Sequence, residues 1–209
     1  MKHEWRKKEK EIYLPKNKPV IIQIPEYKFF TIEGTGNPND DYFSEYIRVL
    51  YSLSYAVKMS IKKGIEPKGY FDYTVYPLEG VWDINEEAKK KFDSKFDKND
   101  LVFKLMIRQP DFVDEQFTMM ILERTKQKKF NVLLDNVKFE KITDGVCVQM
   151  MHLGSYDNEP ESFKQMEDFA QQQNLNRTSK VHREIYISDA RKVAPEILKT
   201  VLRFQVKKV

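Results

Sequence analysis

The chain has 209 residues, of which 41% are hydrophobic and 33% are charged. This composition is typical of a folded domain and excludes a disordered chain. Lys and Arg number 36 against 32 Asp and Glu, and the two signs are interspersed, so we expect no direct nucleic-acid binding. Cys147 is the single cysteine, which excludes an intrachain disulfide and fits a reducing compartment. Without an apolar run of about 18 residues or an N-terminal apolar signal, we expect a soluble, cytoplasmic protein without a membrane partner.

The first half of the chain begins with a charged arm, residues 1–19, which contains Pro15 and Pro19. β-Branched and aromatic residues predict a strand over 20–33, followed by a loop rich in Gly, Asn and Pro over 34–40. Apolar residues spaced by three and four predict a helix over 42–62, with Gly64 as its C-cap. Three further elements complete this half: strands over 70–78 and 101–108, and a helix over 113–128.

The second half restarts the same series. A strand is predicted over 137–153, with a turn at 143–145, and the Gly-containing loop 154–158 follows it. Pro160 suits the first turn of a helix over 160–173. Two more strands, 181–187 and 201–206, end the chain, with a short helix at 195–199 between them.

This order predicts an α+β fold: a tandem, pseudo-symmetric repeat of a strand–helix–strand–strand unit that forms antiparallel sheets with a central ligand cleft. We expect residues 20–209 to form a single domain after the arm, residues 1–19. The first repeat is predicted to span about 20–110, and a helical linker about 113–129. The second repeat is predicted to span about 137–207.

The predicted strand over 181–187 carries the strongest candidate site. Alternation with period two places His182, Glu184, Tyr186 and Ser188 on one face. In a cleft, the Glu184 carboxylate would be partly desolvated, which raises the pKa of such a group and suits a general base. Tyr186 could donate a hydrogen bond to a ligand. The alternatives are a polar face of the strand turned to solvent and a structural role for Tyr186.

Several aromatic residues are candidates for the wall of a pocket. Trp82 follows the predicted strand and a turn at Glu79-Gly80, which is a common place for a pocket wall, although a core tryptophan is the other interpretation. Tyr46 and Tyr55 lie on the first helix, and Tyr156 follows the second Gly-containing loop. Together with His182, these are the predicted ligand-binding residues: Trp82, Tyr46, Tyr55, Tyr156 and His182.

No metal site or cofactor is expected. His3, His152 and His182 are far apart and lack the spacing of metal ligands, and His152 in its strand is interpreted as structural. Gly34 and Gly36 lack the rest of a phosphate-binding motif, so we interpret them as turn-forming residues.

Four motifs occur in an order that resembles the GyrI-like family, the effector-binding domain of AraC-type and multidrug-sensing regulators. The resemblance spans residues 20–206. The motifs lie at residues 34–38, 76–82, 152–156 and 182–203.

The resemblance implies the tandem fold and an aromatic cleft. In regulator members an acidic residue in that cleft meets cationic aromatic drugs, and Glu184 matches its position. Some stand-alone members are hydrolases that open the cyclopropane rings of DNA-alkylating natural products, and we expect this chain to be without the DNA-binding domain of the regulators. We therefore expect a cyclopropanoid cyclohydrolase that detoxifies planar aromatic xenobiotics, with Glu184 and Tyr186 catalytic. The alternative is a non-catalytic drug sponge or sensor. The chain is expected to be a monomer or homodimer.

Overall fold

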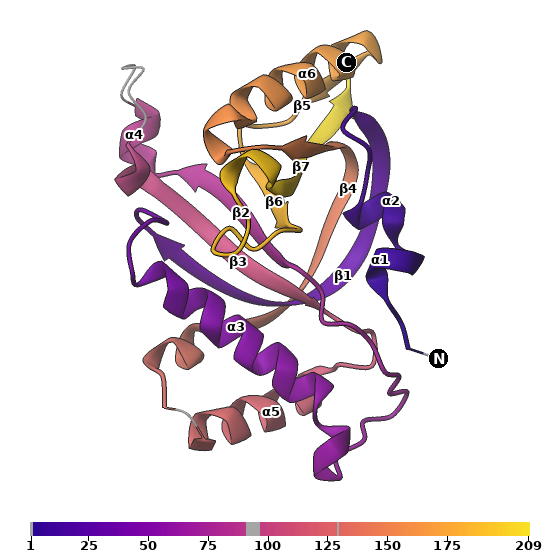
Figure 1. Ribbon diagram of the computed structural model, residues 1–209, viewed down its shortest axis with the longest axis vertical. Helices are drawn as coiled ribbons and strands as arrows, with labels where there is room; N and C mark the ends of the chain where they lie inside the picture. Colours follow the sequence, from indigo (N-terminus) through magenta and orange to yellow (C-terminus); the bar gives the residue numbers. More distant parts are fainter. Residues whose placement is uncertain (1, 91–96, 129) are drawn as a thin grey trace. The chain divides into compact units, whose positions relative to one another are not determined.

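The computed structural model describes residues 2–90, 97–128 and 130–209. It is an α+β structure whose strands form a sheet, with antiparallel registers at β1–β3 and along β7 (Figure 1). Contacts divide the described residues into two compact units. Unit 1 contains the described residues within 1–3, 27–78 and 82–142. Unit 2 contains those within 4–26, 79–81 and 143–209. Three strands contribute residues to both units: β1 (Val20–Thr35), β2 (Leu78–Ile84) and β4 (Lys138–Leu153).

In unit 1, residues 28–35 of β1 pair antiparallel with residues 102–109 of β3 (Leu101–Gln109). Helix α3 (Phe43–Lys58) packs against β3 and against α5 (Glu115–Lys128), as Figure 1 shows. Its buried residues recur at helical spacing, which explains why this segment forms an amphipathic helix. They are Val49, Leu50, Leu53, Ser54 and Val57. The shorter elements of this unit are η1 (Ile61–Lys63), α4 (Glu86–Lys90), η2 (Lys98–Asp100) and η3 (Val132–Asn136).

In unit 2, β7 (Lys199–Lys208) is the central strand. It pairs antiparallel with β4, with β5 (Leu175–Arg177) and with β6 (His182–Tyr186). Helix α6 (Glu159–Gln172) covers apolar residues of β4 and β7, because Met166 and Ala170 are buried with Val148, Leu202 and Phe204. Two short turns flank these elements: η4 (Tyr156–Asn158) and η5 (Pro195–Ile197).

The N-terminal arm is folded. It forms α1 (Trp5–Lys8) and α2 (Lys10–Tyr13), and the rings of Trp5 and Tyr13 are buried 5.2 Å apart. The carbonyl of Lys16 accepts a hydrogen bond from the backbone N–H of Met151 at 3.0 Å. Residues 4–26 thereby belong to unit 2.

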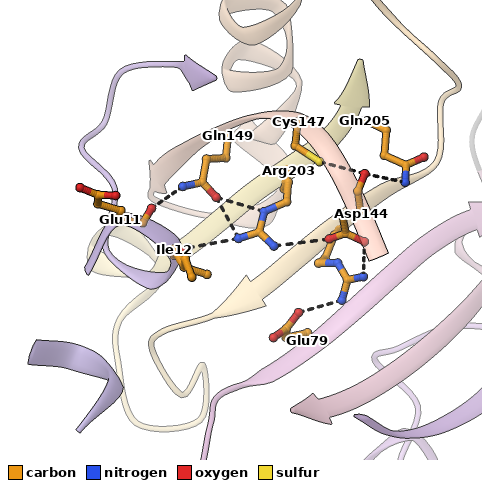
Figure 2. A network of polar contacts seen from close by, with 9 residues as sticks. Glu11, Ile12, Glu79, Asp144, Cys147, Gln149, Arg203 and Gln205 are labelled. Atoms are coloured by element: carbon orange, nitrogen blue, oxygen red, sulfur yellow. Dashed lines mark hydrogen bonds and ion pairs between the residues drawn. The ribbon is translucent and has the colours of Figure 1, made fainter. Parts of the chain in front are cut away.

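A buried polar network fixes one face of β6 in unit 2 (Figure 2). Arg183 donates to the Glu79 carboxylate at 2.8 Å and to the Asp144 carboxylate at 2.6 Å. Arg203 donates to Gln149 Oε1 at 2.9 Å and to the Ile12 carbonyl at 3.2 Å. The Cys147 thiol is fully buried beside this network and donates to the Asp144 carbonyl at 3.6 Å.

The predicted fold class is confirmed. The order strand–helix–strand–strand occurs first as β1, α3, β2 and β3, and again as β4, α6, β6 and β7, with the short β5 inserted. The linker helix predicted over 113–129 corresponds to α5, and residue 129 lies outside the described residues. The pseudo-symmetry of the repeats and the domain boundaries stay predictions.

The strand predicted over 70–78 is wrong. β2 begins at Leu78 and includes Glu79 and Gly80, which the sequence had indicated as a turn. Glu79 can lie inside a strand because Arg183 neutralises its buried carboxylate. The aromatic residues that precede β2 form a cluster of ring contacts instead of a strand, in which the ring of Tyr73 contacts those of Phe71, Tyr76 and Phe112. Trp82 therefore lies within a strand and not beyond its end.

The turn predicted at 143–145 is also wrong, since β4 continues through it. Gly145 adopts a φ of 70°, which glycine takes without strain, and Asp144 binds two buried arginines there. None of the helices in the described part of the chain is long and apolar enough to cross a membrane.

Candidate functional site

β6 presents two different faces, as its alternation predicts. Arg183 and Ile185 are buried on one face, where Arg183 joins the polar network. His182, Glu184 and Tyr186 lie on the other face. The backbone pairing of β6 with β7 fixes which face Glu184 occupies, and the two carboxylates that hold Arg183 stabilise this orientation.

A second carboxyl group meets Glu184. Glu159, the first residue of α6, is 7% exposed, and Glu184 is 8% exposed. Ligand atoms of Glu159, His182 and Glu184 all lie within 4.8 Å of one another. Burial raises the pKa of Glu159, and the nearby Glu184 carboxyl raises it further. Two carboxylates this close and this buried cannot both be ionised at little cost, so Glu159 holds a proton near neutral pH.

His182 adds a basic group to this pair. Its Nδ1 lies 3.3 Å from the Lys180 carbonyl, which can only accept, so Nδ1 carries a hydrogen. Its Nε2 lies 3.1 Å from Glu184 Oε1. Phe163 packs its ring edge-on against the imidazole at 4.7 Å. Glu159, His182 and Glu184 therefore form one compact polar cluster.

Two tyrosines adjoin the cluster. Tyr156 and Tyr186 contact each other edge to face, with ring centroids 6.2 Å apart. Burial, followed by the charges of Glu184, Glu159 and Asp189, raises the pKa of Tyr156 to about 12. Tyr156 therefore keeps its phenolic hydrogen and can donate it. His152 positions this loop, because its Nε2 donates to the Ser155 carbonyl at 3.0 Å and its Nδ1 accepts from Ser162 at 2.9 Å.

The other three predicted ligand-binding residues lie in unit 1. Trp82 is 6% exposed and packs against Phe43 and Phe103. Tyr46 also contacts Phe103, at 5.4 Å between centroids. Tyr55 is on α3 as well but nine residues further, about 13.5 Å along the axis, and is 51% exposed beside Tyr51. Trp82 and Tyr46 thus share an aromatic cluster to which Tyr55 does not belong.

Comparison with known proteins identifies the family. A model of the GyrI-like small-molecule-binding domain matches residues 17–207. The chain belongs to the GyrI-like family. Its motifs had predicted this membership, which is confirmed. No protein of curated function matches the chain.

Solved structures support this assignment. A hydrolase from Listeria innocua is 33% identical, with a TM-score of 0.88, and the match covers 98% of this chain and 100% of that one. A second hydrolase from Listeria innocua is 36% identical, with a TM-score of 0.89, covering 99% and 100%. The C-terminal domain of EcmrR shares only 17% identity and a TM-score of 0.53 over 92% and 98%, so it shows the same GyrI-like fold and no more.

Sequence reasoning missed Glu159 in this GyrI-like chain. An acidic residue in the first turn of a helix usually interacts with the helix dipole in solvent, and nothing in the residues around Glu159 indicates burial. The available signal was Pro160, which places Glu159 at the start of α6 directly after the loop of Tyr156. Glu184, Tyr186, Tyr156 and His182 were predicted as site residues, and unit 2 brings these four together.

The cluster has the donor types of a metal site. One imidazole nitrogen and two carboxylate oxygens suit Zn²⁺, Mn²⁺ or Fe²⁺. Glu159 Oε1 has no hydrogen-bond partner among the described residues. A metal would require Glu159 to lose the proton that burial favours, so protonation and metal binding are competing states of the same cluster. The expectation of no metal stays a prediction.

Proposed function

We propose that this GyrI-like protein binds planar aromatic or cationic small molecules and hydrolyses them by opening a strained ring of the cyclopropane type. Glu184 is the general base and Glu159 the neutral partner acid. The observation that carries the proposal is the pair of buried carboxyl groups, Glu159 and Glu184, in which burial and the neighbouring Glu184 raise the pKa of Glu159. Such a pair can divide acid and base roles between neighbouring groups. The two Listeria innocua hydrolases, at 33% and 36% identity, support a hydrolytic reaction.

The reaction follows from these roles. Glu184 accepts a proton from water while the water oxygen bonds to the ring methylene and one carbon–carbon bond of the cyclopropane breaks. The electron pair of that bond enters a conjugated dienone and leaves a phenolate oxygen. Tyr186 or Tyr156 donates a hydrogen bond to this oxygen as its charge develops. The proton on Glu184 returns to the phenolate, so the product is the substrate plus one water.

Incubation of the protein with a cyclopropane-bearing, dienone-type alkylator, followed by mass spectrometry, tests this proposal. We expect a product that has gained one water. Glu184→Gln should reduce the rate by a factor of about 10² or more, the usual contribution of a general base. Glu161→Gln is the matched control, because Glu161 is an exposed residue in the first turn of the same helix, and should keep the wild-type rate.

Other outcomes are informative. Hydrolysis by Glu184→Gln at the wild-type rate would contradict the assigned base. If the wild type binds the compound but leaves it unchanged, the protein is a non-catalytic binding module and not an enzyme. Prior treatment with EDTA should leave the rate of hydrolysis unchanged. If EDTA abolishes hydrolysis and Zn²⁺ or Mn²⁺ restores it, the cluster is a metal-binding site. Trp82, Tyr46 and Tyr55 stay predicted ligand contacts, and Tyr55 lines a groove beside α3 in unit 1.

A further inference from the structure

A groove runs between α3 and α5 in unit 1, where Figure 1 shows the two helices side by side. Its volume is about 440 Å³. Ala56 and Met59 line it from α3 and the segment that follows, and Ile65 and Ile121 supply further apolar surface. A groove of this size accommodates a small organic molecule. None of its lining residues belongs to the Glu184 cluster.

Three cations line the same groove: Lys63, Arg124 and Lys128. Arg124 and Lys128 are four residues apart on α5 and so lie on one side of that helix. The Lys63 ammonium is close enough to Lys128 that this neighbour, together with burial and Arg124, lowers the pKa of Lys63. Among the residues that the structure describes, no carboxylate lines the groove and none forms an ion pair with any of the three cations. Lys126, between them on α5, is by contrast paired with Asp135 and Glu123.

Ser60 provides an independent indication of a ligand. It lines the groove and is fully buried, and its Oγ has no hydrogen-bond partner in the described part of the protein. A buried hydroxyl without a partner is unfavourable. An acceptor atom of a bound molecule would satisfy this hydroxyl and also separate the repelling cations.

We propose that the α3–α5 groove binds a small amphipathic anion. A single carboxylate or phosphate is held by Lys63, Arg124 and Lys128, and its apolar body lies against Ala56, Met59 and Ile121. The sign of the charge decides the class of ligand, because three cations without a neighbouring carboxylate repel the cationic compounds that the Glu184 cluster would attract. The groove is therefore a second site with a different specificity.

Calorimetric titration of the full chain with four ten-carbon probes tests the proposal. Decanoate and decyl phosphate are expected to bind, and higher salt should weaken both. Decanol is expected not to bind. Decyltrimethylammonium is expected not to bind in the groove, so any heat that it produces should be the same for Ala56→Phe, which fills the groove, as for the wild type. A preference between the two anions distinguishes a carboxylate ligand from a phosphate ligand. Equal binding of all four probes would overturn the proposal, since apolar contact alone would then explain it.

Substitutions locate the site. Lys63→Gln and Arg124→Gln should each weaken decanoate binding about ten-fold, the effect of one lost charge-assisted hydrogen bond. Lys62→Gln is the control, because Lys62 is exposed and does not line the groove. Ala56→Phe fills the groove without changing its charge and should abolish binding. If Lys63→Gln, Arg124→Gln and Ala56→Phe all bind like the wild type, with unchanged unfolding temperatures, the groove is not the site.

Ser60→Ala gives a readout that a purely structural role would not produce. It should weaken anion binding and at the same time raise the unfolding temperature of the free protein, because a buried hydroxyl without a partner is removed. Ser54→Ala is the matched control, since Ser54 on α3 is also a buried serine but its Oγ accepts a hydrogen bond from Gln109 at 3.0 Å, and the substitution should lower the unfolding temperature. Unchanged binding by Ser60→Ala would remove the hydroxyl from the proposed site.

Discussion

At the scale of single residues, the proton on Glu159 links the candidate site to stability. Burial and the neighbouring Glu184 raise the pKa of Glu159 in the folded state. A raised carboxyl pKa means that the folded state binds the proton more tightly than the unfolded chain. The stability that this provides is complete below the unfolded pKa, near 4.5, and is lost as the pH rises through the folded pKa.

Glu159→Gln should therefore change the pH dependence of stability. Glutamine keeps the shape and a hydrogen-bond donor but cannot ionise. Relative to wild type, the variant should become more stable as the pH rises from 5 to 8, by up to about 1.4 kcal/mol per pH unit. Urea unfolding at each pH measures this difference. A constant difference across this range would show that Glu159 titrates normally, and Glu161→Gln should show little pH-dependent change.

The shared face of the β6 side chains could be predicted, because the alternation along a strand depends only on neighbouring positions in the sequence. His182, Glu184 and Tyr186 need only the period of two to share a face. Glu159 could not be predicted, because it reaches Glu184 through the packing of α6 and not through spacing along the chain. The same limit applies to Ser60, whose missing partner is a property of the folded groove alone.

At the scale of secondary-structure elements, the contact between Glu79 and Arg183 joins β2 to β6. Both side chains are almost fully buried, and 104 positions separate them in the sequence. The sequence pattern predicted a turn at Glu79-Gly80, because an acidic residue beside a glycine is common in turns. The partner that allows the acid to be buried lies too far along the chain to influence such a pattern.

Glu79→Gln should destabilise the protein by about 3 kcal/mol, because it leaves a buried arginine with one carboxylate fewer. Chemical denaturation measures the loss. Lys164→Ala removes an exposed ion pair with Asp168 on α6 and should have little effect. A loss no larger than that of Lys164→Ala would mean that Asp144 alone neutralises Arg183.

At the scale of the whole molecule, each unit is assembled from separate stretches of chain. Unit 2 combines residues 4–26, 79–81 and 143–209. The order of the elements could be predicted from local signals. The assignment of the arm to unit 2 could not, because its charged composition gives no sign that Trp5 and Tyr13 are buried.

A fragment of residues 137–209, the predicted second repeat, should not fold alone. Without Glu79 and the Ile12 carbonyl, Arg183 and Arg203 lose buried partners. Circular dichroism of the fragment should show mostly unfolded chain, while the full chain serves as the control. Cooperative thermal unfolding of the fragment would instead support an autonomous repeat.

The buried thiol has a consequence for a protein proposed to handle alkylating compounds. Cys147 is the only cysteine in the chain and is fully buried, and burial followed by the charge of Asp144 raises its pKa to about 11. The thiolate is the form that reacts with electrophiles, and at neutral pH it is nearly absent here. The strongest intrinsic nucleophile of the chain is thus withheld from the electrophiles that such a protein would encounter, and we expect little self-alkylation at the Cys147 thiol.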